Sequence, residues 1–147
     1  MNILVSACLL GVCCRYDGKS RPHDGVIALG KKHRLIPVCP ETAGGLPTPR
    51  PACEIVGDRV ISVEGIDRTE QYRKGAASAL KTAQKFGCKY AVLKLRSPAC
   101  GVNAVYDGSF TGTLAYGKHG VAAALLLENG IFVLGEDMLS QLPEEEL

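Results

Sequence analysis

The sequence predicts an α/β fold: a single-domain, Rossmann-like three-layer sandwich with a mainly parallel sheet and a small β-hairpin. Short β-branched apolar runs alternate with helical patterns, which is typical of a parallel sheet covered on both faces. No linker long enough to divide the 147 residues is visible. A chain of this length buries about 68–70% of its unfolded surface. We therefore expect residues 1–147 to form one domain around one core.

The first half of the chain is expected to hold two strands, a short helix and the hairpin. The strands are predicted at residues 2–6 and 35–38, and Asp24 is expected to cap a helix at 26–29. Residues 42–51 are crowded with glycine and proline, so we expect irregular, stiff backbone there. The segments 54–56 and 59–63 flank Gly57-Asp58, a sequence typical of a hairpin turn.

The second half begins with the clearest helix. We expect Asp67 or Thr69 to cap this helix at its start and Gly87 to end it. Between them, apolar residues recur at helical spacing. The remaining elements are predicted as a strand at 90–93, a glycine-rich loop at 105–117, a helix at 121–127, a strand at 131–134 and a solvated acidic tail at 144–146.

Composition argues against several classes of partner. The formal net charge is only +2 and aromatic residues make up 5%, so neither charge nor stacking favours a nucleic-acid partner. The apolar run at 121–127 is far short of the roughly 20 residues that cross a bilayer. An export signal requires a basic residue before its apolar stretch, and no Lys or Arg precedes the short apolar stretch at the N-terminus. We expect a cytoplasmic protein without a membrane partner, and its oligomeric state stays open.

The seven cysteines are the most informative feature. Structural disulfides are rare in the cytosol, so thiolate chemistry or metal ligation is the better expectation. Cys8, Cys39 and Cys100 each follow a predicted strand. Because the carboxyl ends of parallel strands lie side by side, these three thiols are in a position to converge. The alternative for each is a small buried apolar residue.

The spacing of the cysteines bears on the metal. Zinc sites usually show paired ligands such as C-x2-C, and this sequence has none. Three thiolates with one open position suit an iron–sulfur cluster with a free iron. Cys14 is a candidate fourth ligand or sulfur-handling thiol, and a redox-active thiol pair is a further alternative. Cys88 follows the end of the long helix and is expected to pack.

Polar residues near these cysteines are candidates for catalysis. Glu41 is two residues from Cys39 and Ser97 is three residues from Cys100. A carboxylate can act as general base and a hydroxyl can donate to a developing anion, although both residue types also cap turns. The other loop carboxylates are Asp17, Glu54 and Asp107. The candidate arginines for balancing or binding an anion are Arg15, Arg50 and Arg96, with surface salt bridges as the alternative. The scattered histidines, which we expect at the surface or in loops, are His23, His33 and His119.

Several segments together resemble one family, long labelled a domain of unknown function, whose understood members are thiouracil desulfidases. The segments are Ser6-Ala7-Cys8-Leu9-Leu10-Gly11, Cys14-Arg15-Tyr16-Asp17-Gly18, Pro37-Val38-Cys39-Pro40-Glu41, Gly44-Gly45-Leu46, Pro49-Arg50, Ser97-Pro98-Ala99-Cys100-Gly101 and Tyr106-Asp107-Gly108. The resemblance runs from about residue 3 to residue 136. Ala99 stands where serine is common, and Cys13 and Cys53 lie outside the motifs.

The resemblance implies a 4Fe–4S cluster held by Cys8, Cys39 and Cys100, with the fourth iron open to the sulfur of a thiolated pyrimidine. It also implies non-redox desulfuration, in which 2-thiouracil and water give uracil and hydrogen sulfide. Glu41 and Ser97 match the family's acid–base positions. Cys14 matches a family position as well, so its role as ligand or sulfur-handling thiol stays open. The alternatives are a cluster-dependent sulfurtransferase and a non-catalytic iron–sulfur redox sensor.

Overall fold

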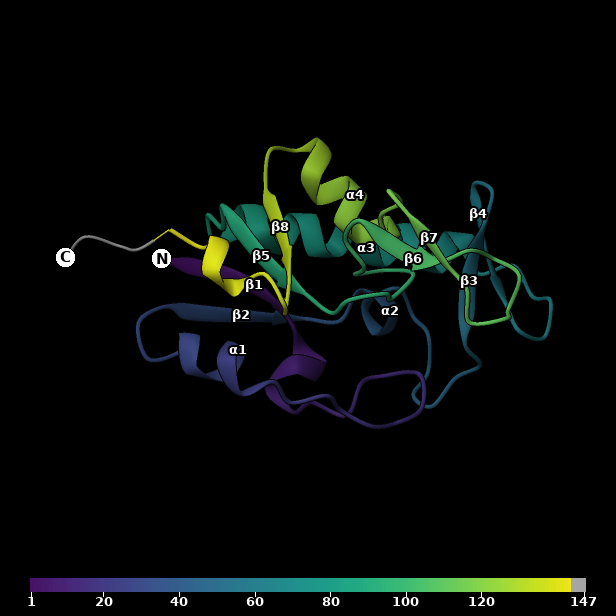
Figure 1. Ribbon diagram of the computed structural model, residues 1–147, viewed down its shortest axis with the longest axis horizontal. Helices are drawn as coiled ribbons and strands as arrows, with labels where there is room; N and C mark the ends of the chain where they lie inside the picture. Colours follow the sequence, from purple (N-terminus) through teal and green to yellow (C-terminus); the bar gives the residue numbers. More distant parts are fainter. Residues whose placement is uncertain (144–147) are drawn as a thin grey trace.

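Four parallel strands form the central sheet, in the order β2-β1-β5-β8 (Figure 1). The structure is a computed structural model that describes residues 1–143. The strands are β1 (Asn2–Ser6), β2 (Arg34–Val38), β5 (Tyr90–Leu93) and β8 (Phe132–Gly135). β1 pairs with β2 on one side and with β5 on the other. The carboxyl ends of these three strands therefore lie side by side at one edge of the sheet.

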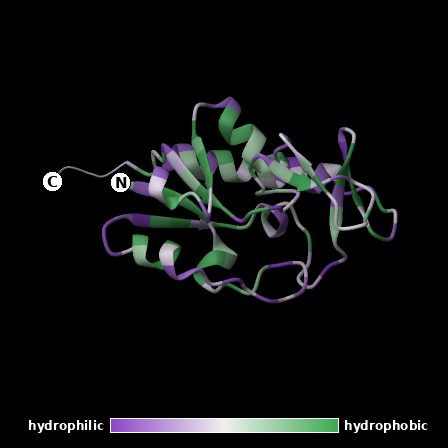
Figure 2. Ribbon diagram, viewed as in Figure 1, coloured by the Kyte–Doolittle hydropathy of each residue, from purple (hydrophilic) through white to green (hydrophobic). Residues whose placement is uncertain are grey.

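Each face of the sheet is covered, which confirms the predicted three-layer arrangement. The covering helices are α1 (Asp24–Leu29), α3 (Thr69–Lys85) and α4 (Val121–Glu128). Leu4 and Leu93 point into the core beneath α3 and α4. Ile3 and Val5 point the other way and pack with Val26 of α1. Because both faces are buried at the middle of the sheet, the central residues of β1 and the whole of β5 after its first residue are apolar and buried, and the sheet is largely hydrophobic in Figure 2.

Smaller elements extend the chain beyond the sheet. They are the 3-10 helices η1 (Ala7–Leu10) and η2 (Leu139–Gln141), the one-turn helix α2 (Pro40–Ala43), and the strands β3 (Cys53–Val56), β4 (Arg59–Ser62), β6 (Ala104–Tyr106) and β7 (Leu114–Tyr116). The antiparallel pair β3–β4 confirms the predicted hairpin. The long helix and the third parallel strand also lie where the sequence predicts them, but the cap position of the helix is Arg68 and not Asp67 or Thr69.

Three further local predictions were wrong. The stretch expected to be irregular starts inside α2, which Pro40 opens at its first position. The predicted glycine-rich loop contains a second hairpin, β6–β7. The cap of α1 is His23, whose Nδ1 accepts the Val26 N–H at 3.2 Å, and not Asp24. The acidic tail predicted at 144–146 lies outside the described residues.

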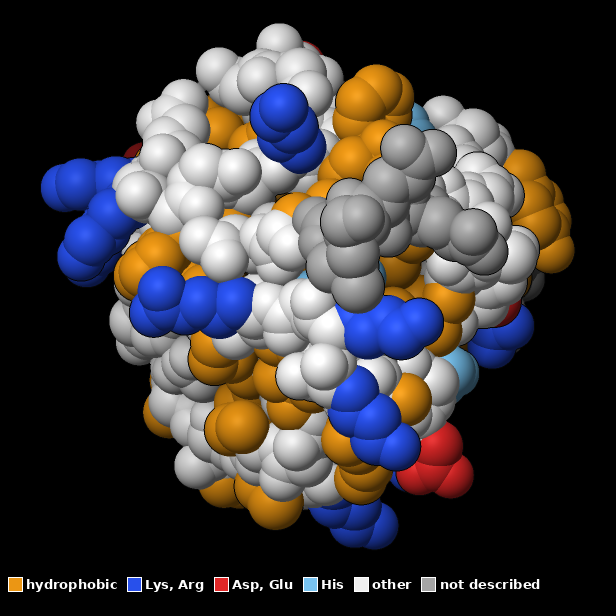
Figure 3. Space-filling model, turned by 90° about the vertical axis from the view of Figure 1, so that its left-hand side faces the viewer, with side chains coloured by type: hydrophobic (Ala, Val, Ile, Leu, Met, Phe, Trp, Pro, Cys, Tyr) orange, Lys and Arg blue, Asp and Glu red, His pale blue; other side chains and the backbone are white. Residues whose placement is uncertain are grey.

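The two ends of the sheet differ in chemistry. Figure 3 looks onto the end with the two termini, where Lys and Arg side chains predominate among the charged groups and apolar side chains lie between them. The opposite end, where the strands finish, carries the cysteines considered below. Among the described helices, none has the length and apolar character needed to cross a membrane.

Candidate active site

A cavity of about 370 Å³ opens at the carboxyl ends of β1, β2 and β5. Cys8, Cys39 and Cys100 all line it, as do Glu41 and Ser97. Segments from the first and last thirds of the chain thus meet at one edge of the sheet. The structure brings together every candidate that the sequence placed at this site.

The three thiols reach the cavity from three neighbouring strands. Cys8 lies in η1, directly after β1, and Cys39 is the residue that precedes α2, directly after β2. Cys100 lies in the turn after β5 and is held by hydrogen bonds within that turn. Cys8 and Cys100 are buried, and Cys39 is partly exposed. Convergence follows from strand order, because β1 stands between the other two strands.

Burial governs the protonation of these thiols. Desolvation raises the pKa of Cys8 to about 11 and raises that of Cys100 further. A hydrogen bond between the Cys14 and Cys39 side chains lowers the pKa of Cys39 and raises that of Cys14. The Sγ atom of Cys39 also lies 3.7 Å from the backbone oxygen of Cys14. Buried thiols of this kind become thiolates readily only beside a strong positive charge, such as a metal.

Two cations stand close to Cys8. The charges of Lys94 and Arg15 both act to lower its pKa, against the larger effect of burial. Arg15 forms an ion pair with Asp17, with Nη2 and Oδ2 3.4 Å apart. Its other terminal nitrogen, Nη1, is buried and has no hydrogen-bond partner among the described residues. A buried guanidinium N–H without an acceptor is costly, so this atom favours an anionic group in the cavity.

These residues fit an iron–sulfur cluster better than a single ion. Among residues 1–143, no group of three or more His, Cys, Asp or Glu side chains is close enough to hold one metal ion. A cluster spreads its ligands over several metal atoms, and thiolates are its usual ligands. Three cavity thiols, two nearby cations and an unsatisfied guanidinium N–H suit a cluster that carries negative charge with its thiolates.

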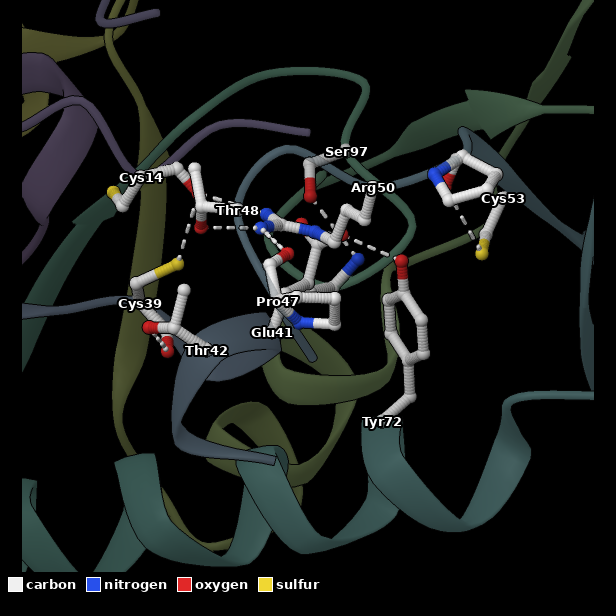
Figure 4. Close-up of polar contacts among 12 residues, drawn as sticks. Cys14, Cys39, Glu41, Thr42, Pro47, Thr48, Arg50, Cys53, Tyr72 and Ser97 are labelled. Carbon is white, nitrogen blue, oxygen red and sulfur yellow. Dashed lines mark hydrogen bonds and ion pairs between the residues drawn. The ribbon is translucent and has the colours of Figure 1, made fainter. Parts of the chain in front are cut away.

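Glu41 lies on α2 and is held from one side (Figure 4). The hydroxyl of Tyr72 donates to its Oε1 atom at 2.6 Å, and Arg50 Nε donates to the same oxygen at 3.3 Å. No described residue hydrogen-bonds to Oε2. The carboxylate is therefore fixed by one oxygen, while the other oxygen is available to a ligand in the cavity.

Arg50 organises the loop after α2. It is 7% exposed and donates to the backbone oxygens of Pro47 at 3.1 Å and Cys14 at 2.8 Å. It also donates to Thr48 Oγ1 at 3.1 Å. Together with its bond to Glu41, these contacts connect the proline-rich stretch to the segment that carries Cys14. Its guanidinium is thus largely used within the protein.

Ser97 supports the turn that carries Cys100. Its Oγ atom accepts the N–H groups of Ala99 and Cys100, both at 3.1 Å. The turn-capping alternative is therefore correct. These two bonds use the oxygen as acceptor, so they leave the hydroxyl proton of Ser97 available for donation at the cavity.

The other predicted residues divide between the cavity and the rest of the molecule. Those that line the cavity are Cys14, Cys53, Arg15, Arg50, Arg96 and Glu54. Cys13 is exposed, and Cys88 is buried in the core beside α3. Glu54 Oε1 accepts the N–H groups of Gly108 and Phe110, which ties the two hairpins together. The histidines make structural contacts: His23 caps α1, His33 Nδ1 lies 3.3 Å from the N-terminal amine, and His119 Nδ1 accepts the Asn103 N–H.

Three residues at or beside the site were not predicted. Ser6 is buried, accepts the Lys94 N–H at 2.9 Å and hydrogen-bonds to Cys100. Lys94 pairs with Glu136, with Nζ and Oε2 3.2 Å apart. Tyr72 belongs to the apolar pattern of the long helix, which indicated burial but not its bond to Glu41. Two signals were available in the sequence: Lys94 directly follows a predicted strand, and Ser6 ends another and opens the segment that carries Cys8.

Comparisons with known proteins agree with this geometry. The family model described as 2-thiouracil desulfurase matches residues 3–138. A curated relative, "Uncharacterized protein YbbK" of Bacillus subtilis (strain 168), is 36% identical over 150 residues, covering 95% of this chain and 99% of the relative. A solved structure described as the [4Fe-4S]-dependent thiouracil desulfidase TudS is 43% identical, with a TM-score of 0.91. That match covers 96% of this chain and 94% of the other.

Proposed function

Since this chain belongs to the 2-thiouracil desulfurase family, we propose that it removes the sulfur of 2-thiouracil by hydrolysis at a 4Fe–4S cluster. The observation that carries the proposal is that three strand-end thiols and the hydrogen-bonded carboxylate of Glu41 line the same cavity. The family and the cofactor expected from the motifs are confirmed by the similar proteins. The assignment of individual residues is our proposal.

Cys8, Cys39 and Cys100 would hold the cluster, with Arg15 and Lys94 as the neighbouring positive charges. When bound, the cluster supplies a Lewis-acidic iron suited to the soft thiocarbonyl sulfur. The Nη1 group of Arg15 is available to donate to the sulfur-rich anion. We place Cys14 outside the ligand set, because the three strand ends already supply a complete set of three thiolates.

Glu41 and Ser97 then divide the proton chemistry. Glu41 accepts a proton from water at Oε2, and the water oxygen attacks the carbon that carries sulfur. Ser97 donates its hydroxyl proton in a hydrogen bond to the substrate ring or to the charge that develops during attack. The C–S bond breaks as a C=O bond forms. The proton held by Glu41 and the proton of the attached hydroxyl pass to the departing sulfur, so 2-thiouracil and water give uracil and hydrogen sulfide and Glu41 is a carboxylate again. No electron is transferred, and no reductase is required.

The proposed substrate is a small thiolated pyrimidine, and the residues that we assign to the site all line one cavity of one domain. The proposal also places the protein in the cytoplasm, where thiols stay reduced and can be loaded with iron. A nucleic-acid partner has no support in the net charge.

The test is an anaerobic preparation with iron and sulfide counts, a visible spectrum and product analysis. We expect about four irons per chain, as a 4Fe–4S cluster requires. We also expect equal amounts of uracil and hydrogen sulfide from 2-thiouracil with no sulfur acceptor present. Stoichiometric zinc without iron after reconstitution would refute the cluster. Turnover that requires an acceptor would instead indicate a sulfurtransferase.

A further inference from the structure

The carboxylate of Glu41 meets a buried tyrosine behind the cavity. Tyr72 lies on α3, is 1% exposed and is not among the residues that line the cavity. Its hydroxyl donates to Glu41 Oε1 at 2.6 Å, a short bond of the kind that charged acceptors form. Tyr72 therefore reaches the site through Glu41 and has no access to a substrate.

The hydroxyl of Tyr72 is the closer of the two donors to Glu41. Burial and the neighbouring Glu41 carboxylate raise the pKa of Tyr72, so its proton stays in place. Arg50, the other donor to Oε1, also bonds three groups of the loop and so holds more than the carboxylate. The Tyr72 hydroxyl has Glu41 as its hydrogen-bond acceptor. Removing that hydroxyl therefore acts mainly on Glu41, and Cys53 is the other side chain that interacts with it.

Two glycines set the distance between Tyr72 and Glu41. A Cβ atom at Gly75 would lie 1.7 Å from the Pro40 backbone oxygen, and one at Gly44 would lie 1.9 Å from the Gln71 backbone oxygen. Helices α2 and α3 thus touch backbone to backbone. Gly75 is three residues after Tyr72, on the same side of α3. This close contact brings α2, and with it Glu41, within reach of the tyrosine.

We propose that Tyr72 is a positioning residue, which fixes Glu41 through Oε1 so that Oε2 faces the reacting water. This inference rests on the proposed function and on Glu41 as its base. A carboxylate held by two donors from one side has little freedom to rotate. Preorganisation of this kind matters for turnover, since small displacements of a reacting group cost large factors in rate.

The first experiment compares cluster-loaded Tyr72→Phe with the wild type. The substitution keeps the buried ring and removes only the hydroxyl. We expect kcat to fall about 10–100-fold with KM changed less than about twofold and the iron content unchanged. Tyr90→Phe is the matched control, because Tyr90 stacks on Phe132 and does not line the cavity. Wild-type turnover by Tyr72→Phe would overturn the proposal, as would a loss that merely follows the loss of iron.

The second experiment separates positioning from a purely structural role. In a Glu41→Gln background, adding Tyr72→Phe should cause no further fall in kcat, because the group that Tyr72 positions has already been removed. An equal fall in both backgrounds would show that Tyr72 acts elsewhere.

A readout independent of turnover keeps this test distinct from that of the proposed function. The carboxylate stretch of Glu41, identified in infrared spectra by its absence in Glu41→Gln, should shift in Tyr72→Phe and stay in place in Tyr90→Phe. An unshifted band would overturn the positioning role whatever the activity. Failure of the loaded wild type to release sulfide would overturn the proposed function, while a shifted band would still establish the contact.

Discussion

Two sides of the same cavity are built in opposite ways. The thiol side (Cys8, Cys39 and Cys100) presents side chains whose burial raises the pKa values of two of them. The carboxylate side (Glu41 with Tyr72 and Arg50) is hydrogen-bonded within the chain itself. We propose that a bound metal group completes the thiol side, whereas the carboxylate side is already organised by its hydrogen bonds. Variants should accordingly separate into those that lose the cluster and those that keep it but turn over slowly.

The largest effects are expected on the thiol side. Cys8→Ser, Cys39→Ser and Cys100→Ser should each lose the cluster and all measurable activity, because a hydroxyl is a poor ligand for iron. Iron and sulfide counts after anaerobic preparation, with the visible spectrum, measure this. Cys88→Ser is the control that should keep the cluster, since Cys88 lies in the core beside α3. Loss of the cluster in Cys14→Ser, with retention in one of the first three, would refute our ligand set.

On the carboxylate side, Glu41→Gln should retain the cluster and lose about 10²–10⁴-fold in kcat, the usual contribution of a general base. The amide keeps the shape of the side chain and can still accept a bond from Tyr72. Substrate affinity should change much less, because Glu41 does not hold the sulfur. Near-wild-type kinetics of the loaded variant would remove Glu41 from the mechanism and direct attention to Glu54, which also lines the cavity.

The contact between α2 and α3 can be broken without touching either side chain of the pair. Gly75→Ala places a methyl group against the Pro40 backbone and must displace α2, so we expect stability to fall by about 1–3 kcal/mol. Because α2 carries Glu41, kcat should fall as well, by up to about 10²-fold. Denaturant unfolding and kinetics measure the two effects. The exposed neighbour Lys74→Ala should change neither, and an unaffected Gly75→Ala variant would show that α2 tolerates the shift.

Ser97→Ala should have the smallest effect. It removes the acceptor for two turn N–H groups, at a cost of about 1 kcal/mol in stability. We expect kcat to fall less than about tenfold, because water can replace a hydrogen-bond donor. Thermal unfolding and turnover of the loaded variant test this. A loss as large as that of Glu41→Gln would place the Ser97 hydroxyl at the reacting atoms.

The same contrast appears in what the sequence could predict. The thiol side could be predicted from the sequence, because the end of an apolar run marks the end of a strand and parallel strands finish at one edge of a sheet. The confirmed adjacency of β2, β1 and β5 turned three distant cysteines into neighbours. Burial could not be predicted in the same way, since nothing in the pattern distinguishes the buried Cys14 from the exposed Cys13 beside it.

On the carboxylate side Glu41 was named from the sequence, but the contacts between elements that position it were missed. Tyr72 occupies a position in a helical pattern that reports burial and not the group its hydroxyl meets, which is 31 residues away in sequence. Helix α2 has a single turn, too short to show any periodicity. The strands β6 and β7 have three residues each, which is too short for an alternating pattern to be recognised, so the many glycines around them indicated a loop. Arg50 was named as a candidate for its charge, yet most of its guanidinium hydrogen bonds go to the loop around it.

The strand order also has a consequence for how the protein is made. Synthesis delivers Cys8 and Cys39 early, and the turn with Cys100 only after β5 has been produced. The proposed set of three ligands would therefore exist only once β5 has docked against β1, so cofactor insertion would have to follow sheet assembly. A cluster bound by these three cysteines would tie three strands together across most of the chain, and its binding energy would become resistance to unfolding. Loss of iron would then expose the protein to proteolysis as well as stop its chemistry.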